Sequence, residues 1–230
     1  MILCILIGMS FKLRRSEWWA LAVIAASVVA SIGFYPVLPG SVPSHWNAAG
    51  EIDGYLPRAW GVALMPLIAV VMLALFIIIP RIDPKRDNIE KFRRYFDDFI
   101  VVIFVFLAYL HTLTLVIGAG YPLDLIRFLA PGFAVLFWYV GVLVGHTEPN
   151  WTVGIRTPWT LSSEEVWRKT HILGGKLFRT TGSLALLGII LPSLAIWFIL
   201  VPALGTALVC VVYSYVVFKK LPTRPVGGNT

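Results

Sequence analysis

Long apolar stretches separated by short polar segments dominate the chain. A helix needs about 20 apolar residues to cross the hydrocarbon of a bilayer, and the stretches that approach this length are 18–35, 60–79, 99–118, 126–144, 183–198 and 199–218. The last two are short for full spans, and Pro192 and Pro202 lie near the turn expected between them. The pattern predicts about six transmembrane helices, with a re-entrant hairpin as the alternative for the last pair.

Composition supports a membrane location. A mean hydropathy of +0.83 with 13% charged residues lies outside the range of soluble domains, so the fold class is expected to be an all-α integral membrane protein. No repeat or linker divides the chain, which predicts one membrane domain over residues 1–230. Cys4 and Cys210 are far apart and form neither a disulfide framework nor a metal pattern. The apolar opening MILCILIG precedes its basic cluster, the reverse of a secretory signal, so a signal peptide is not expected.

Basic residues are distributed unevenly between the two sides of the predicted membrane. Seventeen of the nineteen fall on one side, and the other two are Arg58 and Arg127. Basic loops stay in the cytoplasm, which predicts a multi-pass protein of the plasma membrane with both termini cytoplasmic. This topology accounts for the net charge of +7. Basic clusters beside spans meet anionic lipid headgroups, so membrane lipids are expected partners and nucleic acid is not.

Two polar features stand out, one in an inner loop and one within a predicted span. The inner segment 80–98 carries Glu90, Arg93 and Arg94 at helical spacing, which predicts a structural helical extension of the third span. His111 is the one ionisable residue far from the end of a predicted span. Such a group is a candidate functional site, and the alternative is a neutral histidine bonded to a neighbouring Ser, Thr or Tyr.

The first outer loop, 36–58, has a composition typical of an ordered structure. Prolines stiffen its start, and His45, Trp46 and Asn47 form a compact polar and aromatic group that Glu51 and Asp53 follow. One interpretation is a structured turn with Trp46 in the interfacial aromatic belt. The other is a recognition surface, because binding residues concentrate on ordered polar loops.

The segment 145–181 combines a specific loop with an amphipathic helix. Thr157-Pro158 predicts an extended stretch, and Ser162 with Glu165 has the spacing of a capping box. At helical spacing the apolar stripe comprises Val166, Thr170, Leu173 and Leu177. The opposite, basic side comprises Arg168, Lys169, Lys176 and Arg179. The pattern predicts a helix lying in the membrane interface, with its stripe toward acyl chains and its basic residues toward phosphates.

Two motifs carry a resemblance to a known family. The first, PxHWNxxGExDG, is similar to the short domain at the front of SdpI-family membrane proteins and comprises Pro43, His45, Trp46, Asn47, Gly50, Glu51, Asp53 and Gly54. The second resembles the signature of that family, N-x-x-x-G-I-R-T-P-W-T-x-x-S-x-x-x-W. Its candidate binding residues are Asn150, Gly154, Arg156, Thr157, Pro158, Trp159, Thr160 and Trp167. The two motifs follow the order expected for the family.

The resemblance implies an immunity function. The type member is similar in layout, protects its bacterium from a secreted peptide toxin, and holds a small transcriptional repressor at the membrane when the toxin is present. By position, residues 45–54 would face the toxin and residues 150–175 the cytoplasm. Trp151 and the pair His171-Ile172 depart from the family pattern. No cofactor is implied.

Other classes of protein have weaker support in the sequence. The chain contains neither HExxH nor GxSxG, and its four histidines are dispersed, so no catalytic or metal-binding residue is assigned and an enzyme is not expected. A small transporter would need polar or broken helices at mid-membrane, for which Pro66, Pro131 and His111 are the candidates. A lipid-interacting envelope protein would use the amphipathic helix and leave the outer motif without a role.

Overall fold

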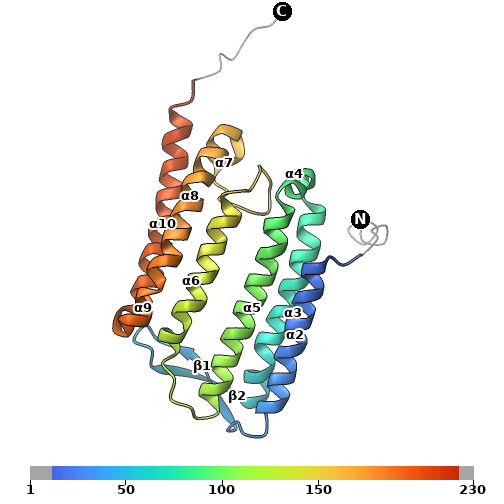
Figure 1. Cartoon of the computed structure of the whole chain (residues 1–230), viewed down its shortest axis with the longest axis vertical. Coiled ribbons are helices and arrows are strands. Elements are labelled where there is room, and N and C mark those ends of the chain that lie inside the picture. Colours follow the sequence, from blue (N-terminus) through green and yellow to red (C-terminus); the bar gives the residue numbers. More distant parts are fainter. Residues whose placement is uncertain (1–11, 223–230) are drawn as a thin grey trace, which may run out of the picture.

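The computed structural model describes residues 12–222, and it is a bundle of antiparallel helices with a small β-hairpin at one end (Figure 1). The apolar opening run and Arg224 lie outside the described residues. The chain forms α2 Arg15–Phe34, β1 Ser41–Trp46, β2 Ile52–Pro57, α3 Arg58–Ile82, α4 Arg86–Lys91, α5 Arg93–Gly118, α6 Leu125–Val144, α7 Pro158–Ser162, α8 Glu164–Ala185, α9 Leu187–Ile190, a 3-10 turn Pro192–Leu194 and α10 Ala195–Lys219.

Within residues 12–222, five segments are long and apolar enough to cross a membrane: α2, α3, α5, α6 and the turn with α10. Each of the first four predicted spans falls on one of these helices. The chain is therefore an all-α membrane protein, as its composition predicts. The hairpin of β1 and β2, which the sequence pattern did not predict, is the only sheet in the described part.

The last predicted pair of spans has different boundaries. The chain turns at Leu191–Leu194, in the middle of the predicted span 183–198, so that span is wrong. Pro192 begins the 3-10 turn, where a missing amide hydrogen costs nothing. The antiparallel partner of α10 is instead α8, which begins about twenty residues earlier and runs the length of the bundle (Figure 1).

Helix α8 is packed inside the bundle between α6 and α10. A methyl group on Gly175 would lie 2.9 Å from the carbonyl oxygen of Gly141, and one on Gly182 would lie 2.6 Å from that of Ala134. Small residues permit such close backbone contact between membrane helices. Val166 and Thr170 of the predicted stripe are fully buried here. The expectation that this stripe faces acyl chains is therefore wrong for Val166 and Thr170, whereas Leu173 and Leu177 are half-buried.

The bundle has two ends with different chemistry. At the first, here called the basic end, lie both described termini, α4, α7 and the loop 145–157 (Figure 1). The hairpin and the loop 119–124 lie at the opposite end, here called the hairpin end. Helices α2, α3 and α5 share an apolar core rich in phenylalanine, to which Leu143 of α6 also belongs.

Ion pairs join the helices at the basic end. The buried carboxylate of Glu17 lies 3.4 Å from Arg81 and 3.7 Å from Arg93, and Arg93 pairs with Asp97 at 2.8 Å. A buried charge needs such partners, because taking it out of water is costly. Arg81 and Arg93 of segment 80–98 therefore fasten α2, α3 and α5 together. The sequence pattern did not identify Glu17.

Candidate functional site

The motif residues of the outer loop build the β-hairpin at the hairpin end. Strands β1 and β2 are antiparallel, with His45 opposite Gly54 and Trp46 opposite Ile52. A side chain at Gly54 would place its first carbon 2.8 Å from that of His45, so glycine is required there. His45 Nδ1 lies 2.5 Å from Asp53 Oδ1. Two predicted site residues that are eight positions apart therefore form one polar pair.

Asn47 organises the turn between the strands. Its Oδ1 accepts hydrogen bonds from the backbone amides of Ala49 and Glu51 at 2.9 and 3.0 Å, and its amide nitrogen donates to the Glu51 carboxylate at 3.0 Å. Gly50 has a φ of +83°, a conformation that suits glycine. Asn47, Gly50 and Glu51 therefore hold the shape of the turn.

Apolar contacts anchor the hairpin to the helices. Val42 of β1 is buried together with Leu38, Val62 and Leu115. A methyl group on Gly61 of α3 would collide with Val42, which shows how closely strand and helix approach. Arg58 donates to the carbonyl oxygen of Leu38 at 3.0 Å and lies 4.5 Å from the centre of the Tyr35 ring. The hairpin is thus a fixed platform rather than a free loop.

The outward surface of this platform is polar and aromatic. The side chains of His45 and Asp53 are 71% and 44% exposed, Tyr55 is also exposed, and Pro43 and Trp46 are half-buried. Because the scaffold is anchored, these groups keep fixed positions while remaining accessible. The hairpin can therefore bind a partner without first ordering itself.

His111 is a buried residue in the C-terminal third of α5. Its Nε2 lies 2.8 Å from the Ser31 hydroxyl of α2, and that hydroxyl donates to the carbonyl oxygen of Ser27 or of Val62. The alternative of a histidine bonded to a neighbouring serine is therefore observed for one ring nitrogen. The other nitrogen, Nδ1, has no hydrogen-bond partner among the described residues. His111 thus links α2 to α5 near α3.

The signature loop, residues 145–157, is folded around Asn150, which is 1% exposed. The Asn150 amide nitrogen donates to the carbonyl oxygens of Glu148 and Val153 at 2.7 and 2.9 Å. Its Oδ1 accepts from the backbone amides of Thr152 and Val153 at 2.8 and 2.6 Å. One side chain therefore closes the loop by satisfying backbone groups on both sides of it.

Two residues outside the motif tie this loop to the corner between α3 and α4. The buried Asp83 carboxylate accepts from the Trp151 amide at 3.0 Å and from the Thr152 hydroxyl. Asn88 donates to the carbonyl oxygen of Pro149 at 2.8 Å. The sequence analysis missed both residues. The DP pair in RIDPKRDN is a turn signal, but nothing local indicates a partner some seventy residues away.

Trp167 and His171 of α8 form hydrogen bonds with the signature loop. The Trp167 indole donates to the carbonyl oxygen of Thr147 at 2.9 Å, and its ring stacks on His171 at 4.0 Å. His171 Nε2 accepts from the Ile155 amide at 2.9 Å, while Nδ1 donates to the carbonyl oxygen of Trp167 at 2.8 Å. These bonds require the neutral ring, and burial lowers the pKa of His171 to about 4.

Gly154 is required by the same packing. Its φ is +125°, and a side chain there would begin 2.5 Å from His171 Nε2. The family resemblance identified Gly154 and Trp167 as site residues, and the structure shows Trp167 buried and Gly154 packed closely against its ring. His171, which the sequence analysis noted only as a departure from the family pattern, is their common partner.

A second structural unit joins the loop to α8 and α10. Thr157 caps the short helix α7 by accepting from the Thr160 amide, Pro158 occupies its first turn, and the Thr157 hydroxyl lies 3.0 Å from that of Ser214. The ring of Trp159 lies 5.1 Å from that of Tyr215 on α10. The predicted capping box is wrong by one position, because Ser163 and not Ser162 accepts from the Val166 amide to begin α8.

Arg156 is one of the few signature residues that remain exposed. Its guanidinium donates to one carbonyl oxygen, that of Trp151. A guanidinium has donors for several carbonyl oxygens, and here it holds one. Trp151 is 53% exposed beside it. Arg156 and Trp151 thus form an accessible edge of a motif in which Asn150, Thr160 and Trp167 are buried.

The basic side chains of α8 point away from its packed face. Arg168, Lys176 and Arg179 are exposed, and Lys169 pairs with Glu165 at 2.7 Å, which lowers the pKa of that carboxyl. Between the start of α8, α4 and the loop 145–149 lies a polar groove of about 690 Å³. Its charged lining residues are Lys91, Glu148, Glu164, Glu165 and Arg168. A groove lined by charges of both signs is better suited to binding a protein surface than to binding a simple anion.

A metal centre is not among the features found. Within residues 12–222, no three His, Cys, Asp or Glu side chains lie close enough together to hold a metal ion. The two candidate regions, the hairpin and the signature loop, are instead built from hydrogen-bonded polar and aromatic side chains at opposite ends of the bundle.

Comparison with known proteins matches both regions. The model of the SdpI/YfhL protein family matches residues 146–215, and that of the domain of unknown function DUF1648 matches residues 22–70. The chain is 27% identical over 207 residues to the immunity protein SdpI of Bacillus subtilis (strain 168), which covers 88% of this chain and 95% of that protein. No solved structure gives a significant match. The first range contains the signature loop and α8, and the second contains the hairpin.

Proposed function

Because the chain belongs to the SdpI family, we propose that it is an immunity protein of the plasma membrane that confers tolerance to a secreted peptide toxin. The observation that carries the proposal is the alignment with nearly the whole of the Bacillus subtilis immunity protein. The hairpin supports it, because it presents His45, Trp46 and Asp53 on an anchored platform. These residues are the proposed toxin contacts.

The proposal includes a cytoplasmic partner at the basic end. The polar groove between α4, the loop 145–149 and α8 would receive a small transcriptional repressor, and its charges of both signs favour a protein surface. Toxin at the hairpin end and repressor at the basic end would then be linked through the bundle. The buried motif residues around Asn150 and Trp167 would keep that groove in shape.

The orientation on which this proposal depends has a direct test. Both termini and the basic end are proposed to be cytoplasmic, in accord with the uneven basic residues. Ala48, exposed in the hairpin turn, and Lys220, beyond α10, are each replaced by cysteine in a chain whose own cysteines are alanine. A membrane-impermeant maleimide applied to whole cells should label Ala48→Cys alone. Labelling of Lys220→Cys alone would reverse the assignment.

The function itself is tested by survival. The chain is expressed in a sensitive bacterium that is exposed to the secreted peptide encoded beside its gene, or else to the peptide toxin of the Bacillus subtilis system. Expression should raise survival, and replacing His45, Trp46 and Asp53 together by alanine should remove the protection at unchanged protein abundance. A chain that is present in the membrane but gives no protection against either peptide refutes the proposal.

The inner face has its own experiment. Arg168→Glu places a negative charge in the polar groove, whereas Lys176→Glu places the same charge on the same helix two turns farther along, outside the groove. We expect Arg168→Glu to keep tolerance and lose membrane recruitment of the candidate repressor, and Lys176→Glu to keep both. Equal recruitment by the two variants would remove the groove as the docking site.

A further inference from the structure

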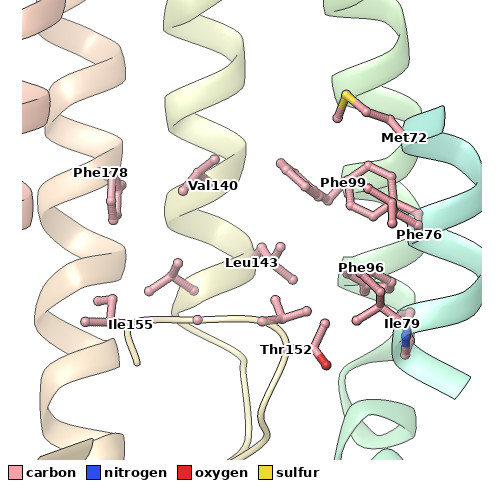
Figure 2. A pocket seen from close by; sticks show the side chains of 15 residues that line it. Met72, Phe76, Ile79, Phe96, Phe99, Val140, Leu143, Thr152, Ile155 and Phe178 are labelled. Atoms are coloured by element: carbon pink, nitrogen blue, oxygen red, sulfur yellow. The ribbon is translucent and has the colours of Figure 1, made fainter. Parts of the chain in front are cut away.

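An apolar cavity of about 470 Å³ lies between the two halves of the bundle near the basic end. Helices α3 and α5 form one wall, α6 and α8 form the other, and residues 152–155 of the signature loop line the basic end. Figure 2 shows Phe76 and Phe99 across the space from Val140 and Leu143, with Thr152 and Ile155 at the end formed by the loop. This cavity is separate from both the hairpin and the polar groove.

The lining and the setting of the cavity determine what can fill it. Thr152 is the one polar side chain among the described residues that line it, and the cavity is not fully enclosed. Three of its lining helices, α3, α5 and α6, are long and apolar enough to cross a membrane, so lipid hydrocarbon is the medium that surrounds them. An apolar space does not hold ordered water. Hydrocarbon that fills it gains the dispersion contacts that an empty space forfeits.

A cation lies beside the loop residues that line the basic end of the cavity. The Arg156 guanidinium donates to the carbonyl oxygen of Trp151, directly beside Thr152 in the lining. Arg156 is otherwise exposed, so further N–H groups of its planar fork are open to an anion. The nearby Asp83 carboxylate already accepts from Trp151, Thr152 and Lys85. The exposed Trp151 indole is the kind of side chain found at the headgroup level.

We propose that this cavity binds one membrane phospholipid, with an acyl chain against Phe76, Phe99 and Val140 and the phosphate on Arg156. A guanidinium binds phosphate through two parallel hydrogen bonds, and the apolar chain extends from that point into the bundle. Zwitterionic and anionic phospholipids share this chemistry. The lipid would fill the gap between the two halves and stabilise the signature loop that lines it.

A peptide is a less suitable occupant of the same space. An extended peptide carries an amide hydrogen and a carbonyl oxygen at nearly every residue, and each costs several kcal/mol when unpaired in hydrocarbon. The lining supplies one polar side chain, that of Thr152, to meet them. An acyl chain carries no such groups.

Lipid binding is measured by native mass spectrometry on the full-length chain in mild detergent. The chain is titrated with phosphatidylglycerol, phosphatidylethanolamine and diacylglycerol. Both phospholipids should bind as one tightly held copy, and diacylglycerol, which lacks phosphate, about fivefold more weakly. Val140→Phe fills the cavity and should reduce binding of all three, whereas Arg156→Gln should lower only the phospholipids, to the level of diacylglycerol.

Matched controls separate the site from general effects on the membrane surface. Val135→Phe makes the same change on α6 at an exposed position outside the cavity, and Arg94→Gln removes a basic charge at the start of α5. Both should bind like the unaltered chain. Equal binding by Val140→Phe and Val135→Phe, or by Arg156→Gln and Arg94→Gln, overturns the proposal.

Two further outcomes decide the remaining cases. If Val140→Phe does not fold, as judged by circular dichroism and gel filtration, the diacylglycerol comparison on the unaltered chain and Arg156→Gln still test the phosphate contact. If Val140→Phe binds lipid normally but loses tolerance to the peptide toxin, the occupant is peptide and the lipid proposal is refuted. Loss of lipid binding with full tolerance would leave the proposed immunity function intact.

Discussion

The hairpin and the signature loop are both marked by long motifs, yet the structure uses those motifs in different ways. In the hairpin, Asn47, Gly50 and Gly54 shape the backbone while His45 and Asp53 remain exposed. In the signature loop, Asn150, Thr160 and Trp167 are each 1% exposed, and Arg156 is accessible. The hairpin motif thus presents side chains, whereas the signature mainly folds a loop against α8, α10 and the corner between α3 and α4.

The difference shows that a specific motif is not by itself a contact surface. A buried polar side chain has strict requirements for its surroundings, because each of its donors and acceptors needs a hydrogen-bond partner. Asn150 and Trp167 meet those requirements inside the protein. Substitutions in the signature loop should therefore act through stability, and substitutions on the hairpin through binding.

The largest expected effect is that of Trp167→Ala. The side chain is 1% exposed and carries the hydrogen bond to Thr147 and the stack on His171. Its loss should lower the free energy of unfolding by about 3–5 kcal/mol, measured by thermal unfolding in detergent. Trp151→Ala, in the same motif but 53% exposed, is the control and should change it by less than about 1 kcal/mol. Equal effects would contradict the internal role of Trp167.

Acid should also destabilise the signature loop. His171 is neutral in the folded protein down to a pKa of about 4, whereas in the unfolded chain it binds a proton near pH 6.5. The stability is fully present above pH 6.5 and is lost as the pH falls toward 4, by about 3 kcal/mol. His171→Gln, which does not titrate, should be less stable at neutral pH but show a flatter dependence over this range. Parallel pH curves for the two proteins would rule out His171 as the cause.

A smaller effect on stability is expected for the hairpin. The triple replacement of His45, Trp46 and Asp53 by alanine removes an exposed hydrogen-bonded pair and a half-buried ring. Exposed pairs contribute about 1 kcal/mol or less, so the melting temperature should change little while toxin tolerance is lost. Val42→Ala, which instead removes the buried anchor of the hairpin, should lower both. A triple variant that melts early would place the hairpin motif in the same structural class as the signature.

The smallest effect on stability should be that of Arg156. Replacement by lysine or by alanine removes one exposed hydrogen bond to the Trp151 carbonyl, worth about 1 kcal/mol. Protection should fall to a similar extent in both variants, because lysine lacks the planar fork that can hold this carbonyl and present further donors. Survival is compared at matched membrane abundance. Full protection by Arg156→Lys would reduce the role of this residue to its charge.

Much of the fold follows from local pattern. Apolar stretches of about twenty residues have few ways to exist in a membrane other than as helices, because their backbone groups must bond within the segment. The first four spans, the inner segments and the turn-rich outer loop can therefore be predicted from the sequence, in which residues such as Trp60, Pro80 and Gly118 mark the boundaries. The family resemblance likewise rests on residues that are visible in the sequence, from His45 to Trp167.

The remaining features depend on contacts between distant residues. The sequence of the α8 stripe is the same whether lipid or α6 covers it. Gly141 and Gly175, which allow α6 and α8 to pack closely, lie far apart in the chain, and their role is visible only in the packed helices. Asp83 and Glu17 appear as ordinary surface acids until Trp151, Arg81 and Arg93 surround them. The sequence alone determined that the chain enters the membrane and where its polar motifs fall. The tertiary structure alone decided which motif residues are buried, because burial is a property of the partner as well as of the residue.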